Sequence, residues 1–563
     1  MIYHCEDHTC NYWDEGEKLP ERCPQCGRKL LRANEADMTG DDWTALGNTL
    51  WYAEASDKKR MVDCFRKAAY LGSAWGVCNL GICMEQGNGV EADPVQAFWL
   101  YQQAVEMGSL NAVCCLGVCY QYGIGTAPDA EKAAELYCKA AEYGSPRGQM
   151  LLARAFHDGI GVEADAAEAV HWVRAAAYQR YGEGMYRLGV CYEYGDGVEQ
   201  NWEHAVHWFR EAAESGVSAA MTDLGYCYEK GCGVEQSWEQ AFSWYRRGAE
   251  CGYPVSMSNL GLCYKRGYGV DQNWQEAIKW YEQGAQCGDL QSMHNLACCY
   301  ERGEGVEQNE ERALYWYRRG AEAGSVYCMF YLGWNYSNGV GVKQNMTEAI
   351  RWYTAAAEGG NADAMHNLGW HYDYGEGVEQ DMKKAICWYE RAAEQNHPAA
   401  MNSLGECYAM GRGVPRDLET AMEWYRRAAE LGEAMADYNM GWHLEQAGKL
   451  SEAYAHYRKA ADGNDDSAWW ALGRFYENGV VVAQDGKEAR RCYETGEKLG
   501  SVKCKMRLAR CKLLGIGGRR AKKAGLDLCR QALELAKESS EKEDYGYEAE
   551  MNLLRRTIAE NES

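Results

Sequence analysis

The fold of this chain is decided by a stretch that recurs along it and that reads, at residues 219–250, AAMTDLGYCYEKGCGVEQSWEQAFSWYRRGAE. Met221, Leu224, Gly225 and Tyr228 fall at positions i, i+3, i+4 and i+7, so they share one face of a helix. Because Gly225 has no side chain, a second helix can approach this face closely. The stretch therefore predicts a helix whose apolar face packs against a neighbour.

A turn and a second helix follow in the same stretch. Gly231 and Gly233 end the first helix, since glycine suits the left-handed backbone of a helix C-cap. Ser237 is placed to cap the next helix, which carries the apolar pair Trp244 and Tyr245. Each copy of the stretch is thus a helix, a turn and a second helix.

The anchor leucine of the first helix, Leu224 in this copy, recurs at intervals of 36 residues. One helix pair cannot bury its own aromatic side chains, but stacked copies share a continuous core. The sequence therefore predicts an all-α protein, a right-handed α/α superhelical solenoid of about fourteen helix-turn-helix repeats. The anchors are Leu46, Leu80, Leu116, Leu152, Leu188, Leu224, Leu260, Leu296, Leu332, Leu368, Leu404, Met440, Leu472 and Leu508, with shorter spacing only at the first interval and before Leu472.

The pattern Leu-Gly-x-x-Tyr-x-x-Gly-x-Gly-Val, followed by Ala-x-x-Trp-Tyr-x-x-Ala-Ala-Glu-x-Gly, resembles the Sel1-like repeat, a relative of the tetratricopeptide repeat. The resemblance covers residues 41–517 and weakens at Met440, where the following loop lacks the glycine pattern. It implies an adaptor that assembles protein complexes, and no enzymatic activity.

Four cysteines near the N-terminus suggest a metal site in front of the repeats. Cys23 and Cys26 have the C-x-x-C spacing that lets two thiolates converge on one zinc ion. Cys5 and Cys10 are less regularly spaced, and His8 could replace one of them as a ligand. The segment resembles a rubredoxin-like zinc ribbon, with zinc as a structural cofactor.

Three domains are therefore expected: a zinc ribbon at 1–35, the repeat solenoid at 36–517 and a C-terminal helical cap at 518–563. The last stretch leaves the repeat pattern but keeps apolar residues among charges, as a segment covering the end of a solenoid requires. The other 22 cysteines lack the regular pairing of secreted, cysteine-rich members of this repeat family, so we expect reduced thiols.

Composition narrows the range of partners and locations. The net charge of −24 repels phosphate backbones and anionic membranes, so neither nucleic acid nor membrane is an expected partner. The start of the chain has no basic, apolar signal sequence, and no run approaches the ~18 apolar residues of a membrane helix. We expect a cytoplasmic protein.

Residues two before, two after and five after the anchor form a second stripe on the first helix, about 100° from the core face. Resemblance to tetratricopeptide repeats implies that this stripe lines the concave surface. Several copies place charged residues there (Arg154, Glu406, Arg474, Arg510), but others place aromatic residues and histidine, and asparagine stands just before some anchors. The candidate partner-binding residues are Trp334, Trp370, Trp442, His294, His366, Phe330, Asn259, Asn295, Asn367 and Asn439. Packing of the tryptophans between helices is the alternative.

Three functions remain open at this point. The first is a scaffold that binds a peptide or protein in the concave groove. The second is a β-lactamase-like hydrolase, since cysteine-rich relatives of the repeat have been associated with penicillin binding. The third is a regulator in which the zinc ribbon recognises a target and the solenoid senses a ligand.

We predict that the purified, chelator-free chain carries about one zinc ion, held by Cys5, Cys10, Cys23 and Cys26. A segment of about 35 residues is too short to form a core alone, so zinc should fold it. Elemental analysis measures the metal content, and circular dichroism of the isolated segment, with and without zinc, measures its folding. An ordered N-terminal segment in metal-free protein would contradict the prediction.

Overall fold

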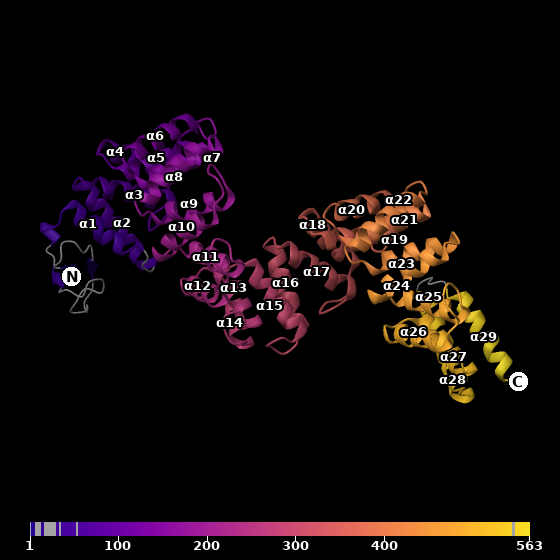
Figure 1. Cartoon of the computed structure of the whole chain (residues 1–563). Coiled ribbons are helices and arrows are strands. Elements are labelled where there is room, and N and C mark those ends of the chain that lie inside the picture. Colours follow the sequence, from indigo (N-terminus) through magenta and orange to yellow (C-terminus); the bar gives the residue numbers. More distant parts are fainter. Residues whose placement is uncertain are drawn as a thin grey trace. The chain divides into compact units, whose positions relative to one another are not determined.

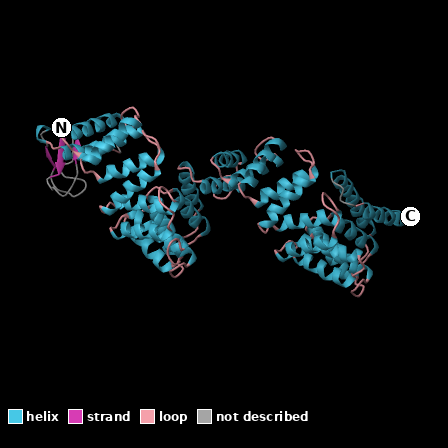
Figure 2. Ribbon diagram, turned by 90° about the horizontal axis from the view of Figure 1, so that it is seen from above, coloured by secondary structure: helices cyan, strands magenta, loops and turns pink. Residues whose placement is uncertain are grey.

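The computed structural model describes residues 2–5, 13–15, 30–32, 35–51, 55–542 and 547–562 (Figure 1). The chain divides into two compact units, Met1–Ser292 and Met293–Ser563. Each unit is built of antiparallel helix pairs joined by short loops, as Figure 2 shows. The superhelical handedness of the whole chain stays a prediction.

Three short strands precede the helices: β1 (Ile2–Cys5), β2 (Trp13–Glu15) and β3 (Leu30–Arg32). They form an antiparallel sheet in the order β2-β1-β3, with Tyr3 opposite both Asp14 and Arg32. Of the predicted zinc ligands, Cys5 ends β1, while Cys10, Cys23 and Cys26, like His8, lie outside the described residues. Zinc binding therefore stays a prediction.

The first unit contains a 3₁₀ turn, η1 (Glu35–Asp37), and then paired helices. These are α1 (Gly40–Thr49), α2 (Ala55–Tyr70), α3 (Ala74–Gln86), α4 (Pro94–Glu106), α5 (Leu110–Tyr122), α6 (Ala130–Glu142), α7 (Pro146–Asp158), α8 (Ala166–Tyr178), α9 (Gly182–Tyr194), α10 (Trp202–Glu214), α11 (Ser218–Lys230), α12 (Trp238–Glu250), α13 (Pro254–Arg266) and α14 (Trp274–Gln286).

The boundary between the units falls within α15 (Leu290–Arg302). The helices that follow are α16 (Glu310–Glu322), α17 (Val326–Asn338), α18 (Met346–Glu358), α19 (Ala362–Tyr374), α20 (Met382–Glu394), α21 (Pro398–Met410), α22 (Leu418–Glu430), α23 (Ala434–Gln446), α24 (Leu450–Asp462), α25 (Asp466–Asn478), α26 (Gly486–Lys498), α27 (Val502–Leu514), α28 (Lys522–Lys542) and α29 (Glu548–Glu562). Helices α1 to α28 thus form fourteen consecutive pairs, which confirms the predicted helix-turn-helix repeat.

The caps form where the glycines and polar residues predict them. Gly231 ends α11 with a φ of 73°, in the left-handed region. Gly233 has a φ of 68°, and a Cβ there would lie 2.3 Å from the carbonyl oxygen of Trp202 in the preceding repeat. Ser237 then caps α12 by accepting a hydrogen bond from the backbone N–H of Gln240. The glycine turn therefore also brings adjacent repeats into contact.

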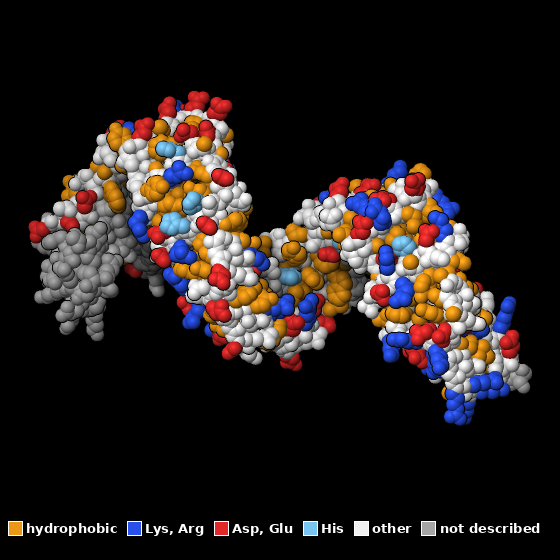
Figure 3. Space-filling model, in the orientation of Figure 1, with side chains coloured by type: hydrophobic (Ala, Val, Ile, Leu, Met, Phe, Trp, Pro, Cys, Tyr) orange, Lys and Arg blue, Asp and Glu red, His pale blue; other side chains and the backbone are white. Residues whose placement is uncertain are grey.

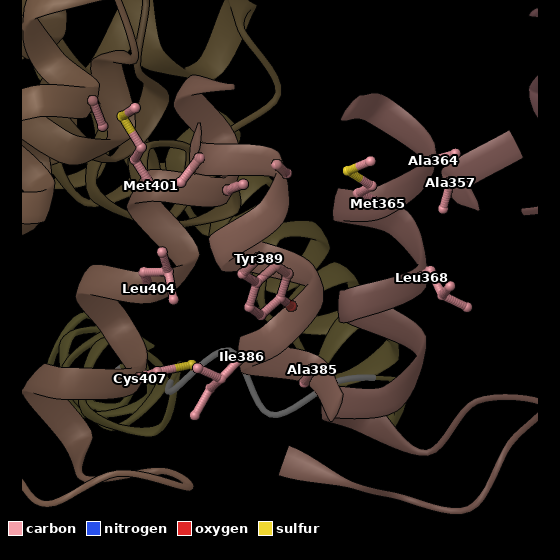
Figure 4. Close-up of a cluster of buried hydrophobic side chains, with 14 of the residues drawn as sticks. Ala357, Ala364, Met365, Leu368, Ala385, Ile386, Tyr389, Met401, Leu404 and Cys407 are labelled. Carbon is pink, nitrogen blue, oxygen red and sulfur yellow. The ribbon is translucent and has the colours of Figure 1, made fainter. Parts of the chain in front are cut away.

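One contact organises the core of almost every pair. The residue after the anchor is glycine, and the ring of an aromatic residue of the second helix lies over it. At Gly225 a Cβ would lie only 2.7 Å from Cε1 of Tyr245. Figure 4 shows the equivalent ring, Tyr389, between the helices that carry Leu368 and Leu404. Eleven rings lie over a glycine in this way, and Tyr317 instead faces Ala297. Together they are the twelve largest fully buried side chains of the described residues: Phe65, Tyr101, Tyr137, Phe209, Tyr245, Tyr281, Tyr317, Tyr353, Tyr389, Tyr425, Tyr457 and Tyr493.

In most pairs the hydroxyl of the buried tyrosine donates a hydrogen bond to the first helix of its own pair. Tyr245 donates to Glu229 Oε2 at 2.9 Å, and Tyr101 donates to Glu85 Oε2 at 2.6 Å. Both glutamates stand five residues after their anchors. This hydrogen bond removes the cost of burying an unpaired hydroxyl and fixes the depth of the ring.

The C-terminal stretch closes the last pair. Helix α28 takes the place of a second helix against α27, and α29 contacts both. Met551 and Leu554 of α29 are buried in one cluster with Met506. Arg507 of α27 also forms an ion pair with Glu550 of α29 at 2.6 Å. The terminal apolar face of α27 is therefore covered by helices, as the end of a repeat array requires.

We predict that Gly225→Ala has opposite effects on stability in two backgrounds. Beside Tyr245 the added Cβ overlaps the ring, and overpacking costs about 1–3 kcal/mol. In Tyr245→Val protein the ring is gone, so the higher helix propensity of alanine should stabilise α11 by about 1 kcal/mol. Urea unfolding of the two single variants and the double variant measures this coupling. Equal effects of Gly225→Ala in both backgrounds would show that the contact does not constrain the residue.

Candidate functional site

The three candidate tryptophans stand two residues after their anchors, on first helices of the unit Met293–Ser563. Trp334 and Trp442 each keep 38% of their surface exposed, and Trp370 is half-buried. Trp370 packs against Tyr374, with ring centroids 5.0 Å apart. We call Trp334, Trp370 and Trp442 the tryptophan stripe. Hydrophobic side chains are exposed between charged ones of both signs in the surface view of Figure 3.

A pocket of about 480 Å³ lies beside the first residue of this stripe. Phe330 and Trp334, both predicted as partner contacts, form part of its wall. The remaining wall is supplied by Glu301, Arg302, Gln308, Glu310, Tyr331 and Val340. Two of the candidate residues are therefore brought together at a concave site with an aromatic wall and acidic side chains.

His294 belongs to an aromatic cluster next to that pocket. Its ring lies 5.3 Å from Tyr331 and 6.3 Å from Tyr317, centroid to centroid. Tyr317 and Tyr331 are themselves stacked, 5.2 Å apart with an interplanar angle of 11°. Phe330 packs edge-on against Tyr331 at 5.2 Å. The cluster fixes the orientation of the pocket wall.

His366 is more enclosed than a solvent-exposed groove residue would be. Its ring stacks on His397 at 5.1 Å, and the Oγ of Ser403 lies 3.4 Å from its Nε2. Burial lowers the pKa of His366 to about 4, helped by the neighbouring His397. His366 is therefore neutral at pH 7, and Nε2 of His397 hydrogen-bonds Asp363 at 3.2 Å.

The four candidate asparagines, Asn259, Asn295, Asn367 and Asn439, are half-buried. Asn439 donates to Asn402 Oδ1 at 3.0 Å and to Glu406 Oε1 at 3.2 Å, both on the preceding first helix. Asn367 lies against the hydroxyl of Tyr353 in the preceding pair. At these two positions the amide joins repeats to each other.

An ion-pair network between repeats was missed at the sequence level. Glu445 accepts hydrogen bonds from the hydroxyl of Tyr457 and from Arg474, each at 2.7 Å. Arg510 pairs with Glu477 in the same way one repeat later. Arginine two residues after an anchor thus binds the acid of the preceding repeat instead of standing in solvent. The sequence pattern that could have predicted this ion pair is an arginine two residues after one anchor together with a glutamate five residues after the previous anchor.

A second pocket, of about 400 Å³, lies in the other unit between α7, α8 and α9. Its floor includes Ala153 and Val173, at the two positions that hold glycine and an aromatic ring in most pairs. Arg147, Arg154, His157 and Arg187 contribute basic side chains to its wall. We call it the α7–α9 pocket. In the sequence, the pocket could have been recognised from valine at residue 173, where most pairs have phenylalanine or tyrosine.

The described residues contain no group of three or more His, Cys, Asp or Glu side chains placed to hold a metal ion. The described helices contain 22 cysteines in the thiol form, most of them buried. Burial raises the pKa of Cys227 and Cys263, each to about 12, as expected for inert core thiols. Across the part of the chain that the structure describes, no helix is both long and apolar enough to cross a bilayer.

Comparison with known proteins agrees with this architecture. Among solved structures, a protective antigen present in uropathogenic Escherichia coli strains, displaying an SLR fold, is 29% identical over 76% of this chain and 94% of its own, with a TM-score of 0.56. A Sel1 repeat protein from Oxalobacter formigenes is 33% identical over 44% of this chain and 98% of its own, with a TM-score of 0.40. A search of curated proteins finds no match.

The family model described as Sel1 repeat matches twelve consecutive segments. They are residues 76–109, 112–145, 146–181, 182–217, 218–253, 254–289, 290–325, 326–361, 362–397, 398–433, 434–465 and 468–501. These segments span more than half of the chain and coincide with the helix pairs from α3 to α26. The chain belongs to the Sel1 repeat family.

Proposed function

We propose that the protein is a scaffold that binds a peptide or protein partner on the tryptophan stripe, with the pocket beside Trp334 as its main anchor site. The observation that carries the proposal is the exposure of Trp334 and Trp442 at a position where two other repeats hold an arginine that pairs with the preceding repeat. Large aromatic side chains supply much contact area at little cost in rotamer entropy.

The comparison between repeats supports a binding role. Where the position holds Arg474 or Arg510, the side chain joins two repeats through Glu445 or Glu477. A tryptophan at this position cannot form that ion pair. The stripe therefore forgoes an internal contact while keeping apolar surface exposed, which favours an external partner.

The chemistry of the surroundings suggests what the partner presents. The pocket wall joins Phe330 and Trp334 to two carboxylates and one arginine, so its acidic groups outnumber its basic ones, and the chain has a net charge of −24. An apolar side chain next to a basic one would complement such a wall. His294 contributes through its contact with Tyr331 of the pocket wall, and zinc in the N-terminal segment would serve a structural purpose only.

We predict that Trp334→Ala combined with Trp370→Ala abolishes partner binding while the melting temperature stays nearly unchanged. Affinity purification from the native host, compared by mass spectrometry with unmodified protein, identifies proteins lost from the variant. Trp99→Ala is the matched control, because Trp99 is 70% exposed and lies outside the stripe. Unfolding of the double variant would identify the tryptophans as core residues, and an unchanged set of captured proteins would also contradict the proposal.

A further inference from the structure

The α7–α9 pocket exists because one repeat lacks its buried ring. Val173 of α8 stands where twelve of the fourteen pairs hold phenylalanine or tyrosine, and Ala153 replaces the glycine that lies under that ring. The other exception, Cys529, is in the terminal pair, where α29 completes the core. The repeats on both sides of Val173 are regular, with Tyr137 and Phe209 fully buried. The missing ring therefore leaves space that no neighbouring repeat fills.

The position of the missing ring can be read from the regular repeats. A buried tyrosine hydroxyl reaches the residue five after its own anchor, as Tyr137 does when it donates to Gln121 at 2.7 Å. It also approaches the residue before the next anchor, as Tyr353 approaches Asn367. Around Val173 these two residues are His157 and Arg187, and both line the pocket.

A second repeat shows which charge is missing beside Arg187. Arg507 is also an arginine directly before an anchor, and it pairs with Glu477, five after the previous anchor, at 3.4 Å. At the α7–α9 pocket that acidic position is His157. No ion pair or hydrogen bond of Arg187 is found among the described residues, and its side chain is exposed at the pocket rim. A guanidinium that binds a carboxylate elsewhere in the fold here has none.

Three carboxylates line the pocket: Glu183 lies against the hydroxyl of Tyr181, and His157 engages the other two, Asp158 and Asp196. Nδ1 of His157 lies 2.7 Å from Asp158, and its Nε2 lies 3.2 Å from Asp196. The hydrogen bond to Asp158 raises the pKa of His157, which favours the imidazolium form. Arg154 donates to the hydroxyl of Tyr122 at 3.2 Å, a neutral partner. The pocket thus keeps basic groups available for an anion, although the chain as a whole is acidic.

We propose that the α7–α9 pocket binds an aromatic carboxylate. The ring lies over Ala153 and Val173, in the space of the missing side chain, and the carboxylate pairs with Arg187. The occupant thereby replaces the two groups that a regular repeat supplies itself: a buried ring and an acid beside the arginine. Such a group is available as a free aromatic acid or as the C-terminal aromatic residue of a peptide. The site lies in the other unit from the tryptophan stripe and is independent of the proposed scaffold function.

Isothermal titration calorimetry of the full chain near pH 7 tests the proposal with matched probes. N-acetyl-L-tyrosine should bind saturably at one site. N-acetyl-L-tyrosine amide, which lacks the carboxylate, and N-acetyl-L-leucine, which lacks the ring, should each bind at least about tenfold more weakly, a loss of about 1.4 kcal/mol. Tighter binding of a hexapeptide ending in tyrosine would identify a peptide terminus as the source, and equal or weaker binding a free acid; both support the site.

Two variants locate the binding. Arg187→Gln should weaken N-acetyl-L-tyrosine at least about tenfold while barely affecting the amide. The combined change Ala153→Gly and Val173→Tyr restores the usual pair, so it should abolish binding and raise the melting temperature. That rise shows that the variant is folded. Trp334→Ala with Trp370→Ala is the control and should bind the probe normally.

Three results would overturn the proposal. The first is the absence of saturable binding of N-acetyl-L-tyrosine to the unmodified chain at millimolar concentration. The second is unchanged binding to the variant in which the ring is restored. Loss of binding in the tryptophan variant would also contradict it, because the probe would then occupy the other unit.

Discussion

The contact between a glycine of the first helix and an aromatic ring of the second is the interaction on which the structure depends. The glycine gives the ring room to lie against the helix backbone, and the ring fills the space between successive repeats. Burial of a ring of about 200 Å² contributes up to about 5 kcal/mol at ~25 cal/mol per Å². With eleven such contacts among the described residues, the array obtains its core from one contact repeated along the chain.

The same framework explains where the surface can vary. Residues that face neither the ring nor the loop are free to serve other purposes, provided that the spacing of repeats is kept. At the position two after the anchor, Arg474 joins repeats through Glu445, whereas Trp334 leaves an aromatic surface beside a pocket. At the ring position itself, Val173 removes part of the core and opens a pocket with a basic wall. Candidate sites thus arise as local departures from a regular pattern.

Much of the fold could be predicted from sequence because the pattern is periodic. Leu224, Met221 and Gly225 lie on the buried face, and Gly231 ends the helix in the left-handed conformation, as their spacing indicates. Seven of the fourteen anchors have a methionine three residues before them, on the face that periodicity places in the core, and six of the seven are buried, including Met365.

The candidate sites were less predictable, since periodicity identifies a face but not what reaches it from the next repeat. Arg474 is a charged residue of the stripe in sequence, and the structure places it 2.7 Å from Glu445 of the preceding repeat. Asn439 was expected to be available to a peptide, yet it donates to two side chains of the preceding helix. A change such as Tyr to Val at residue 173 is visible in the sequence, but the volume that it leaves depends on how neighbouring helices relax.

Hydrogen–deuterium exchange of the unliganded chain tests the central role of the buried ring most directly. Exchange in the middle of a helix reports how readily that repeat opens. The account predicts that backbone amides around Val173 in α8 exchange faster than the equivalent amides around Tyr137 in α6 and Phe209 in α10. Equal or slower exchange around Val173 would show that the ring is not what holds each repeat together.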